Sequence, residues 1–151
     1  MQRLVPADYF LLTFTLPAEL RGLAAAHADV VFDSLMRCAW ETVLRFSRND
    51  RQLQGTPGAI AVLHTHSRRL DFHPHVHLVV PAAAVDEAKR RWRCKRRGKN
   101  GSYLFHEKAL AKVFRAKMLA AIEAAGIPLP VCYPKEWVAH CKSVGSGEKA
   151  L

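Results

Sequence analysis

The chain has 151 residues, of which 50% are hydrophobic, so its length and composition predict one globular domain and exclude an intrinsically disordered protein. The formal net charge of +10 favours a polyanionic partner, above all nucleic acid, over a charge that serves solubility alone. There is no run of about 18 apolar residues, and the four cysteines lie far apart without a C-x-x-C pair, which argues against a membrane span, a zinc ribbon and a disulfide scaffold.

Three strands and one helix are predicted in the first 80 residues. Residues 9–16 are rich in aromatic and β-branched side chains and end before a proline, so we predict the first strand there. Residues 23–46 are predicted to form one helix and residues 59–66 a second strand. Residues 67–71 form a tight connection to a third strand at residues 72–80. The apolar stripe of the helix comprises Val31, Leu35, Ala39, Thr42 and Phe46.

The second half of the chain begins with a basic segment, residues 85–99, whose pattern fits either a short helix or a short strand. We then predict a short strand at residues 103–105, a helix at residues 107–125 and a last strand at residues 136–142. Gly126 follows the helix where a C-terminal cap belongs, and residues 145–148 are predicted to form a turn in which Ser146 caps a new helix. The apolar face of the 107–125 helix comprises Leu110, Val113, Phe114, Met118, Ala121, Ile122 and Ala125.

The order strand, helix, strand, strand, helix, strand predicts an α+β fold of the ferredoxin-like type, with the basic segment inserted after the third strand. In such a sheet the first and third strands are the two central ones. Side chains on the third strand would therefore stand on the most rigid part of the sheet, where a functional site is best preorganised.

The third strand carries histidines at every second position. His73, His75 and His77 would share one face of the strand, because alternate side chains of an extended chain point the same way. The intervening Val76, Leu78 and Val80 would face a core. Neutral imidazoles that converge on one point form a metal site. The alternative is a solvated polar strand face with no ligand.

The neighbouring strand supplies two more histidines. An antiparallel register that pairs His66 with His73 also pairs His64 with His75, with Cβ atoms about 5 Å apart. His64 or His66 could then complete the coordination shell or hydrogen-bond the ligands from outside it, and Asp71 in the connection is a further candidate. The alternative for both histidines is a polar strand end near solvent.

These residues resemble a known family. His75-Val76-His77 matches the His-hydrophobe-His signature of HUH nucleases, and residues 62–68 with 72–80 resemble the two-tyrosine HUH transposases of rolling-circle insertion sequences. Residues 9–20 are similar to the opening of that family's catalytic domain, and residues 136–148 to its close. The resemblance covers nearly the whole chain and is most specific in the histidine block.

The resemblance implies an antiparallel-sheet nuclease core in the bacterial cytoplasm, associated with the nucleoid. His75 and His77 would be the catalytic histidines and would hold Mg²⁺ or Mn²⁺ together with a third polar ligand, for which His64 and His73 are candidates. The cation would polarise a phosphate of single-stranded DNA at the transposon ends. A tyrosine hydroxyl would attack the phosphorus and form a 5′-phosphotyrosine.

The chain departs from that family in two places. The family carries its nucleophilic tyrosines on a helix after the last core strand, and Tyr9, Tyr103 and Tyr133 do not match that motif. The family's cysteine-rich zinc-binding segment is also not matched. We therefore expect residues 1–151 to be a single transposase core without the zinc-binding segment and the tyrosine helix, and we do not expect it to cleave DNA by itself.

The basic segment predicts a nucleic-acid contact. With Trp92 among its cations, it fits a groove that follows a phosphate backbone and stacks bases on aromatic rings, whereas the alternative is a solvated loop. Lys108, Lys112 and Arg115 extend the patch along the following helix. The candidate DNA-binding residues are Lys89, Arg90, Arg91, Trp92, Arg93, Lys95, Arg96, Arg97 and Lys99.

Two rival functions differ in class. A zinc hydrolase is disfavoured, because no H-E-x-x-H motif occurs and no acidic residue lies inside the histidine block. A non-catalytic module that binds single-stranded nucleic acid remains an alternative, since ferredoxin-like sheets often bind single strands through aromatic side chains on the open face of the sheet.

Overall fold

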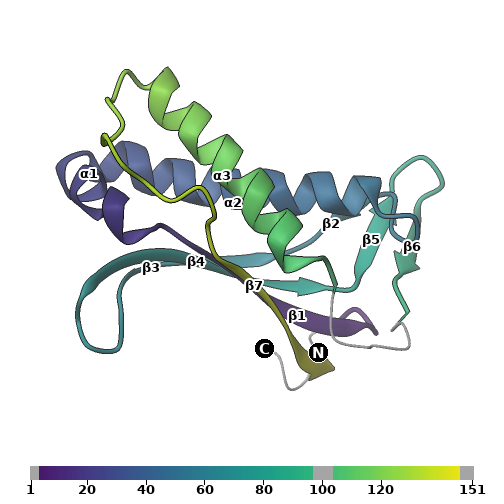
Figure 1. The fold of residues 1–151 in the computed structure, drawn as a ribbon. Helices are drawn as coiled ribbons and strands as arrows, with labels where there is room; N and C mark the ends of the chain where they lie inside the picture. Colours follow the sequence, from purple (N-terminus) through teal and green to yellow (C-terminus); the bar gives the residue numbers. More distant parts are fainter. Residues whose placement is uncertain (1–3, 97–103, 147–151) are drawn as a thin grey trace.

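The fold is organised around a four-stranded antiparallel sheet with the strand order β3-β4-β1-β7 (Figure 1). The computed structural model describes residues 4–96 and 104–146. The central strands are β1 (Asp8–Thr15) and β4 (Phe72–Pro81), and the outer strands are β3 (Ile60–His66) and β7 (Ala139–Ser146). The predicted α+β fold is thus confirmed, and the histidine strand is central in the sheet as predicted.

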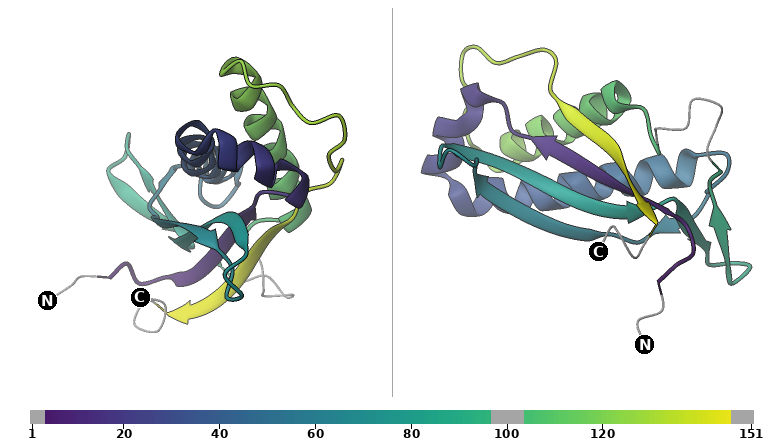
Figure 2. Two further views of the ribbon diagram at one scale, coloured as in Figure 1. Left: turned by 90° about the vertical axis from the view of Figure 1, so that its left-hand side faces the viewer. Right: turned by 90° about the horizontal axis from the view of Figure 1, so that it is seen from below.

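Two helices, α2 (Ala28–Asn49) and α3 (Glu107–Ala124), cover one face of this sheet (Figure 2). Within the described residues, no helix or strand covers the other face, which we call the open face. None of the described helices is long and apolar enough to cross a membrane.

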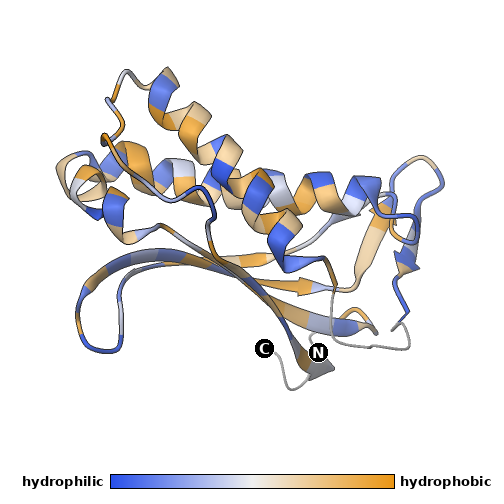
Figure 3. Cartoon of the chain, viewed as in Figure 1, coloured by the Kyte–Doolittle hydropathy of each residue, from blue (hydrophilic) through white to orange (hydrophobic). Residues whose placement is uncertain are grey.

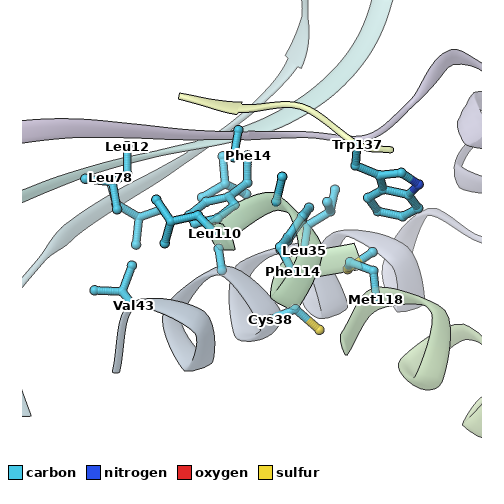
Figure 4. Close-up of a cluster of buried hydrophobic side chains, with 14 of the residues drawn as sticks. Leu12, Phe14, Leu35, Cys38, Val43, Leu78, Leu110, Phe114, Met118 and Trp137 are labelled. Carbon is cyan, nitrogen blue, oxygen red and sulfur yellow. The ribbon is translucent and has the colours of Figure 1, made fainter. Parts of the chain in front are cut away.

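The core lies between the sheet and the two helices. Strand β1 buries Leu12 and Phe14, and β4 buries Val76 and Leu78, because alternate residues of both strands point toward the helices. Phe14 contacts Phe114 of α3, with ring centroids 4.8 Å apart (Figure 4). The predicted stripes of both helices are largely buried, through Val31, Leu35, Ala39 and Thr42 in α2 and through Leu110, Phe114, Met118 and Ile122 in α3.

The prediction of one unbroken helix at residues 23–46 is wrong. A 3-10 turn, η1 (Ala18–Leu20), leads into a separate short helix, α1 (Arg21–Ala26), and the chain bends at His27 before α2 begins. The alanine-rich sequence gives no signal for this bend, because alanine is the best helix former. The bend accompanies a tertiary contact in which Arg21 reaches His73 of β4.

Helix α3 ends as predicted. Gly126 has φ +73°, a conformation that glycine adopts without steric cost. Its N–H donates to Glu123 O at 2.9 Å, and Ile127 N–H donates to Ile122 O at 3.2 Å, which is the Schellman pattern that satisfies the last helical carbonyls.

The basic segment forms a hairpin in a second, three-stranded sheet with the order β2-β5-β6. Strand β2 (Thr56–Pro57) pairs with β5 (Ala83–Asp86), and β5 pairs with β6 (Arg91–Cys94). Figure 3 shows that β5 is apolar and β6 is hydrophilic. Of the two alternatives for the basic segment, the strand is therefore correct in its described part, residues 85–96, whereas residues 97–99 lie outside the described residues.

The predicted strand at residues 103–105 is wrong for Leu104 and Phe105, which form a bend; Tyr103 lies outside the described residues. Both bend residues are buried, and the Phe105 ring lies 5.5 Å from the ring of Phe46. These two apolar residues therefore anchor the chain to α2, which explains why a short apolar run looked like a strand.

The last strand begins three residues later than predicted and runs on to Ser146. The predicted turn at residues 145–148 is wrong for Gly145 and Ser146, which belong to β7, whereas residues 147–148 lie outside the described part. The register between β7 and β1 shifts between Tyr9 and Phe10, and Gly145 has φ +86° there. Gly145 thus supports a β-bulge, which lets the strand continue past a residue that looked like a turn.

The burial of the four thiols gives a test of this fold. All four cysteines are free; Cys38 and Cys141 are buried, and Cys94 and Cys132 are exposed. Burial raises the pKa of Cys38 to about 11 and also raises the pKa of Cys141, so both thiolates are scarce. Native protein treated with iodoacetamide at pH 8 should gain two carbamidomethyl groups quickly, on Cys94 and Cys132, as measured by peptide mass spectrometry. Equally fast modification of Cys38 would contradict the described packing.

Candidate metal centre and nucleic-acid surface

Three imidazoles meet on the open face of the sheet. One ring nitrogen each from His64, His75 and His77 lie within 4.8 Å of one another, which is close enough to hold one metal ion. The ring centroids of His75 and His77 are 4.8 Å apart, and His64 lies 5.2 Å from His75 and 4.8 Å from His77. We call these three residues the histidine cluster.

The cluster follows from the strand register. His75 and His77 are two residues apart on β4 and therefore share a face. His64 pairs directly with His75 across the β3–β4 hairpin, as the sequence predicted. Val76 lies between these two histidines and Leu78 directly after them, and both are fully buried on the opposite face. The hydrophobic core thus determines which way the imidazoles point.

The imidazole of His75 is fixed by its own strand. Its Nδ1 lies 2.6 Å from the backbone carbonyl oxygen of His73, and a carbonyl can only accept, so Nδ1 carries the proton and donates. The Nε2 atom of this tautomer then has a free lone pair. A ring nitrogen that donates to a backbone carbonyl is the usual arrangement behind a histidine that binds metal through its other nitrogen.

His77 is held from the neighbouring central strand. Its Nδ1 lies 3.0 Å from the hydroxyl oxygen of Thr13, which is its register partner on β1. Burial lowers the pKa of His77, and the nearby His75 and His64 lower it further. The imidazole therefore stays neutral to a lower pH than an exposed histidine does, and a neutral imidazole is the form that binds a metal.

His73 lies beside the cluster without belonging to it. Its ring centroid is 5.3 Å from that of His75, but its Nδ1 is in contact with a terminal nitrogen of the Arg21 guanidinium. Burial and the charge of Arg21 lower the pKa of His73. His73 therefore differs from the other two histidines of β4 in having a cation as its partner.

The predicted pairing of His66 with His73 is wrong. The register shifts after His64–His75, and His66 pairs with Phe72 instead. The extra residue of this bulge lies on β4 next to Pro74, which has no N–H to donate to a ladder. His66 is exposed, and its Nδ1 lies 2.9 Å from the Thr65 hydroxyl oxygen. Neither His66 nor Asp71 belongs to the group that could hold an ion among the described residues.

The basic hairpin begins where β4 ends, and its cations are of two kinds. Arg93 forms an ion pair of 2.9 Å with Asp86, and Lys95 forms one of 2.5 Å with Asp50 and donates to Leu104 O at 2.7 Å. Arg93 thus joins the two strands of the hairpin, and Lys95 attaches the residues after β6 to Asp50 and Leu104. The others in the described part are exposed, namely Lys89, Arg90, Arg91 and Arg96, together with the indole of Trp92. Arg97 and Lys99 lie outside the described residues.

The described tyrosines stand away from the histidine cluster. Tyr9 is 5% exposed, and its hydroxyl donates to Val5 O at 3.3 Å at the far end of β1. Tyr133 packs under the guanidinium of Arg115, 5.6 Å from its ring centroid, on the helical side. Tyr103 lies outside the described residues.

Sequence reasoning missed two partners of the histidines. Thr13 could have been found, because it lies in the first predicted strand and the two central strands of a ferredoxin-like sheet are neighbours. Arg21 carried no such signal, because it contacts His73 from the start of the short helix α1, which the sequence does not separate from α2.

Residues 58–151, more than half of the chain, match the Y2_Tnp family, described as "Putative transposase". The chain is 30% identical over 122 residues to "Putative transposase y4qJ" of Sinorhizobium fredii (strain NBRC 101917 / NGR234), an alignment that covers 81% of this chain and 30% of that protein. It is 38% identical over 85 residues to "Transposase for insertion sequence element IS801" of Pseudomonas savastanoi pv. phaseolicola, covering 56% of this chain and 20% of that protein. The chain thus spans less than a third of the length of these relatives.

Solved structures of a conjugative relaxase share the fold. TrwC in complex with mutant OriT DNA superposes with a TM-score of 0.60 at 20% identity, covering 90% of this chain and 50% of that one. The metal-bound complex of TrwC with OriT DNA gives a TM-score of 0.63 at 19% identity, covering 89% of this chain and 49% of that one. Since the family match includes both histidine-bearing strands, the chain belongs to the Y2_Tnp transposase family and has the HUH-type nuclease fold.

Proposed function

We propose that this chain is the metal-binding and DNA-binding core of a rolling-circle transposase that nicks and rejoins single-stranded DNA. The observation that carries the proposal is the histidine cluster, which stands on a rigid central strand and faces the open side of the sheet. A ligand as long as a DNA strand could reach that face, because no described element covers it.

The three imidazoles fit a divalent cation of the transition series. When bound, such an ion would polarise a phosphodiester and stabilise the negative charge on the departing oxygen. His75 and His77 would hold it through nitrogens whose orientation is set by His73 O and Thr13 Oγ1, and His64 would complete a group of three protein ligands. Mg²⁺ prefers oxygen ligands, whereas imidazole suits transition metals, so of the two ions that the resemblance implied we favour Mn²⁺.

Single-stranded DNA is the substrate class that the surface supports. The exposed cations of the basic hairpin can follow a phosphate backbone, and Trp92, 54% exposed, offers a ring on which a base can stack. The TrwC structures are complexes of that relaxase with OriT DNA, which makes the same type of ligand reasonable for a core with the same fold. The ends of the mobile element would be the sites recognised.

In this proposal the attacking tyrosine lies outside residues 4–96 and 104–146, the residues that the structure describes. Tyr9 and Tyr133 are engaged away from the cluster, so neither hydroxyl is in place to attack a phosphate held there. The role proposed for the described residues is to bind the strand and hold the ion.

A purely binding module is the less favoured function. That reading requires aromatic rings on the open face of the sheet, and strand β3 instead exposes Ile60, Val62 and His64 there. A module that only binds DNA also has no need for three converging imidazoles.

The metal ligands can be tested one by one. His64→Ala, His75→Ala and His77→Ala should each weaken Mn²⁺ binding by at least about tenfold, since even the loss of an outer hydrogen-bond partner costs 10–100-fold in known sites. Isothermal titration calorimetry measures the affinity. His66→Ala is the matched control and should bind Mn²⁺ like the unaltered protein, because its ring lies outside the cluster.

The same titration ranks the ions and assigns His73. Mn²⁺ should bind more tightly than Mg²⁺, and His73→Ala should lose less affinity than His75→Ala because Arg21 already occupies the His73 Nδ1. Normal Mn²⁺ affinity in all three cluster variants would refute the proposed metal site.

The salt dependence of DNA binding tests the role of the basic hairpin. Replacing Arg90 and Arg91 with glutamine should weaken binding to a single-stranded oligonucleotide and reduce the slope of log K against log salt by roughly 1.4, at about 0.7 for each lost phosphate contact. Fluorescence anisotropy at several salt concentrations gives the slope. A slope equal to that of the unaltered protein would show that the hairpin does not contact the strand.

Because no described tyrosine lies at the histidine cluster, we expect this protein to bind single-stranded DNA without becoming covalently attached to it. The 151-residue protein mixed with single-stranded DNA and Mn²⁺ should give no adduct that survives denaturing electrophoresis. An adduct that disappears in Tyr9→Phe, Tyr103→Phe or Tyr133→Phe would place the nucleophile within this chain and contradict the assignment.

A further inference from the structure

A cationic cavity lies on the helical side of the fold, between α3 and the segment that leads into β7. Its volume is about 390 Å³. Four cations line it, Lys108, Lys112, Arg115 and Lys135, together with the carboxylate of Glu136 and the indole of Trp137. We call it the α3 cavity. With four positive charges against one negative charge, it attracts anions.

The cations of α3 are arranged unfavourably unless an anion is present. Lys108, Lys112 and Arg115 recur at intervals of four and three residues and so form one stripe along the helix. Like charges at such spacings destabilise a helix. The third lysine of the helix, Lys117, instead pairs with an acidic residue: its Nζ lies 3.5 Å from Glu41 Oε2. A bound anion would therefore stabilise this stripe of cations.

Arg115 is held in a fixed orientation in the cavity wall. Its Nε donates to Pro134 O at 3.3 Å, and its guanidinium lies over the Tyr133 ring. A guanidinium has five N–H donors, so its two terminal amino groups remain able to donate. A planar fork held in this way suits two oxygens of one phosphate.

Trp137 adds an unused donor. Its side chain is 7% exposed and packs on Phe114 with ring centroids 5.9 Å apart. Its Nε1 is buried and has no hydrogen-bond partner among the described residues. In Figure 4 this nitrogen lies on the side of the ring away from the labelled core side chains. Burying an N–H without an acceptor is costly, and an oxygen in the cavity that Trp137 lines would supply one.

Polar side chains extend from the histidine cluster, across the edge strand β7, to the α3 cavity. Thr13, which contacts His77, pairs in register with His140 of β7. The His140 Nδ1 lies 3.4 Å from Glu107 Oε2, in the first turn of α3, and Lys108 is the next residue. A polar row thus leads from the open face to the cavity.

We propose that the α3 cavity binds a backbone phosphate of the same DNA strand that lies over the histidine cluster, so that the strand wraps around β7. This inference rests on the proposed function, and it adds a second anchor point that is remote from the metal. The anchor would position the strand and would take no part in the chemical step.

The first test compares two double variants that lose equal charge. Lys108→Gln with Lys112→Gln should weaken binding to a 30-nucleotide single strand and lower its salt slope by about 0.7, the value for one lost phosphate contact. The control, Arg37→Gln with Lys117→Gln, removes two cations that flank Glu41 and should leave the slope unchanged. A slope in the cavity variant equal to that of the control would overturn the inference.

The second test observes the cavity directly. The chain has three tryptophans, and Trp40→Phe and Trp92→Phe identify two of the indole N–H signals in a ¹H–¹⁵N spectrum, which leaves that of Trp137. This signal should shift when the oligonucleotide is added, and the shift should be absent in the Lys108/Lys112 variant. No shift with DNA, even if inorganic phosphate shifts the signal, would contradict a DNA anchor.

Mn²⁺ titration of the same samples separates this inference from the proposed function. The cavity variant should bind Mn²⁺ normally. Normal Mn²⁺ binding with a silent cavity refutes the anchor alone, whereas a cavity that responds to DNA in a protein without Mn²⁺ binding supports the anchor and refutes the nuclease role.

Discussion

The constraint on which this structure depends is the alternation of β4 between a buried and an open face. Val76 and Leu78 are fully buried against the helices, so His75 and His77 must point the other way. A shift of one residue in the register would place the imidazoles in the core and the aliphatic side chains in solvent, at a large cost in free energy. The hydrophobic core therefore orients the polar site.

The neighbouring strands add the side chains that complete the histidine cluster around His75 and His77. Strand β3 brings His64 opposite His75, and β1 brings Thr13 opposite His77. Each of the two β4 imidazoles has a hydrogen-bond partner on one nitrogen, which leaves the other free. Preorganisation of this kind lowers the cost of binding an ion, because little side-chain freedom remains to be lost.

Much of this was predictable from the sequence, and the failures have physical causes. The period-two histidines, the central position of their strand and the His64–His75 pair follow from side-chain alternation and from the order of elements. The displacement of His66 from His73 depends on a bulge next to Pro74, and Arg21 contacts His73 from a separate short helix, α1, that the sequence does not indicate. Bulges and bends of this kind are tertiary features that periodicity does not encode. The bulge at Gly145 was likewise mistaken for a turn, since both need a residue with positive φ.

The central claim is that three imidazoles bind one ion. Pulsed electron paramagnetic resonance of the Mn²⁺-loaded protein, labelled with ¹⁵N-histidine, detects the nitrogens that are bonded to the metal. Three coupled histidine nitrogens, reduced to two in His64→Ala, are the predicted result. A spectrum with no histidine nitrogen coupled to Mn²⁺ would contradict the account.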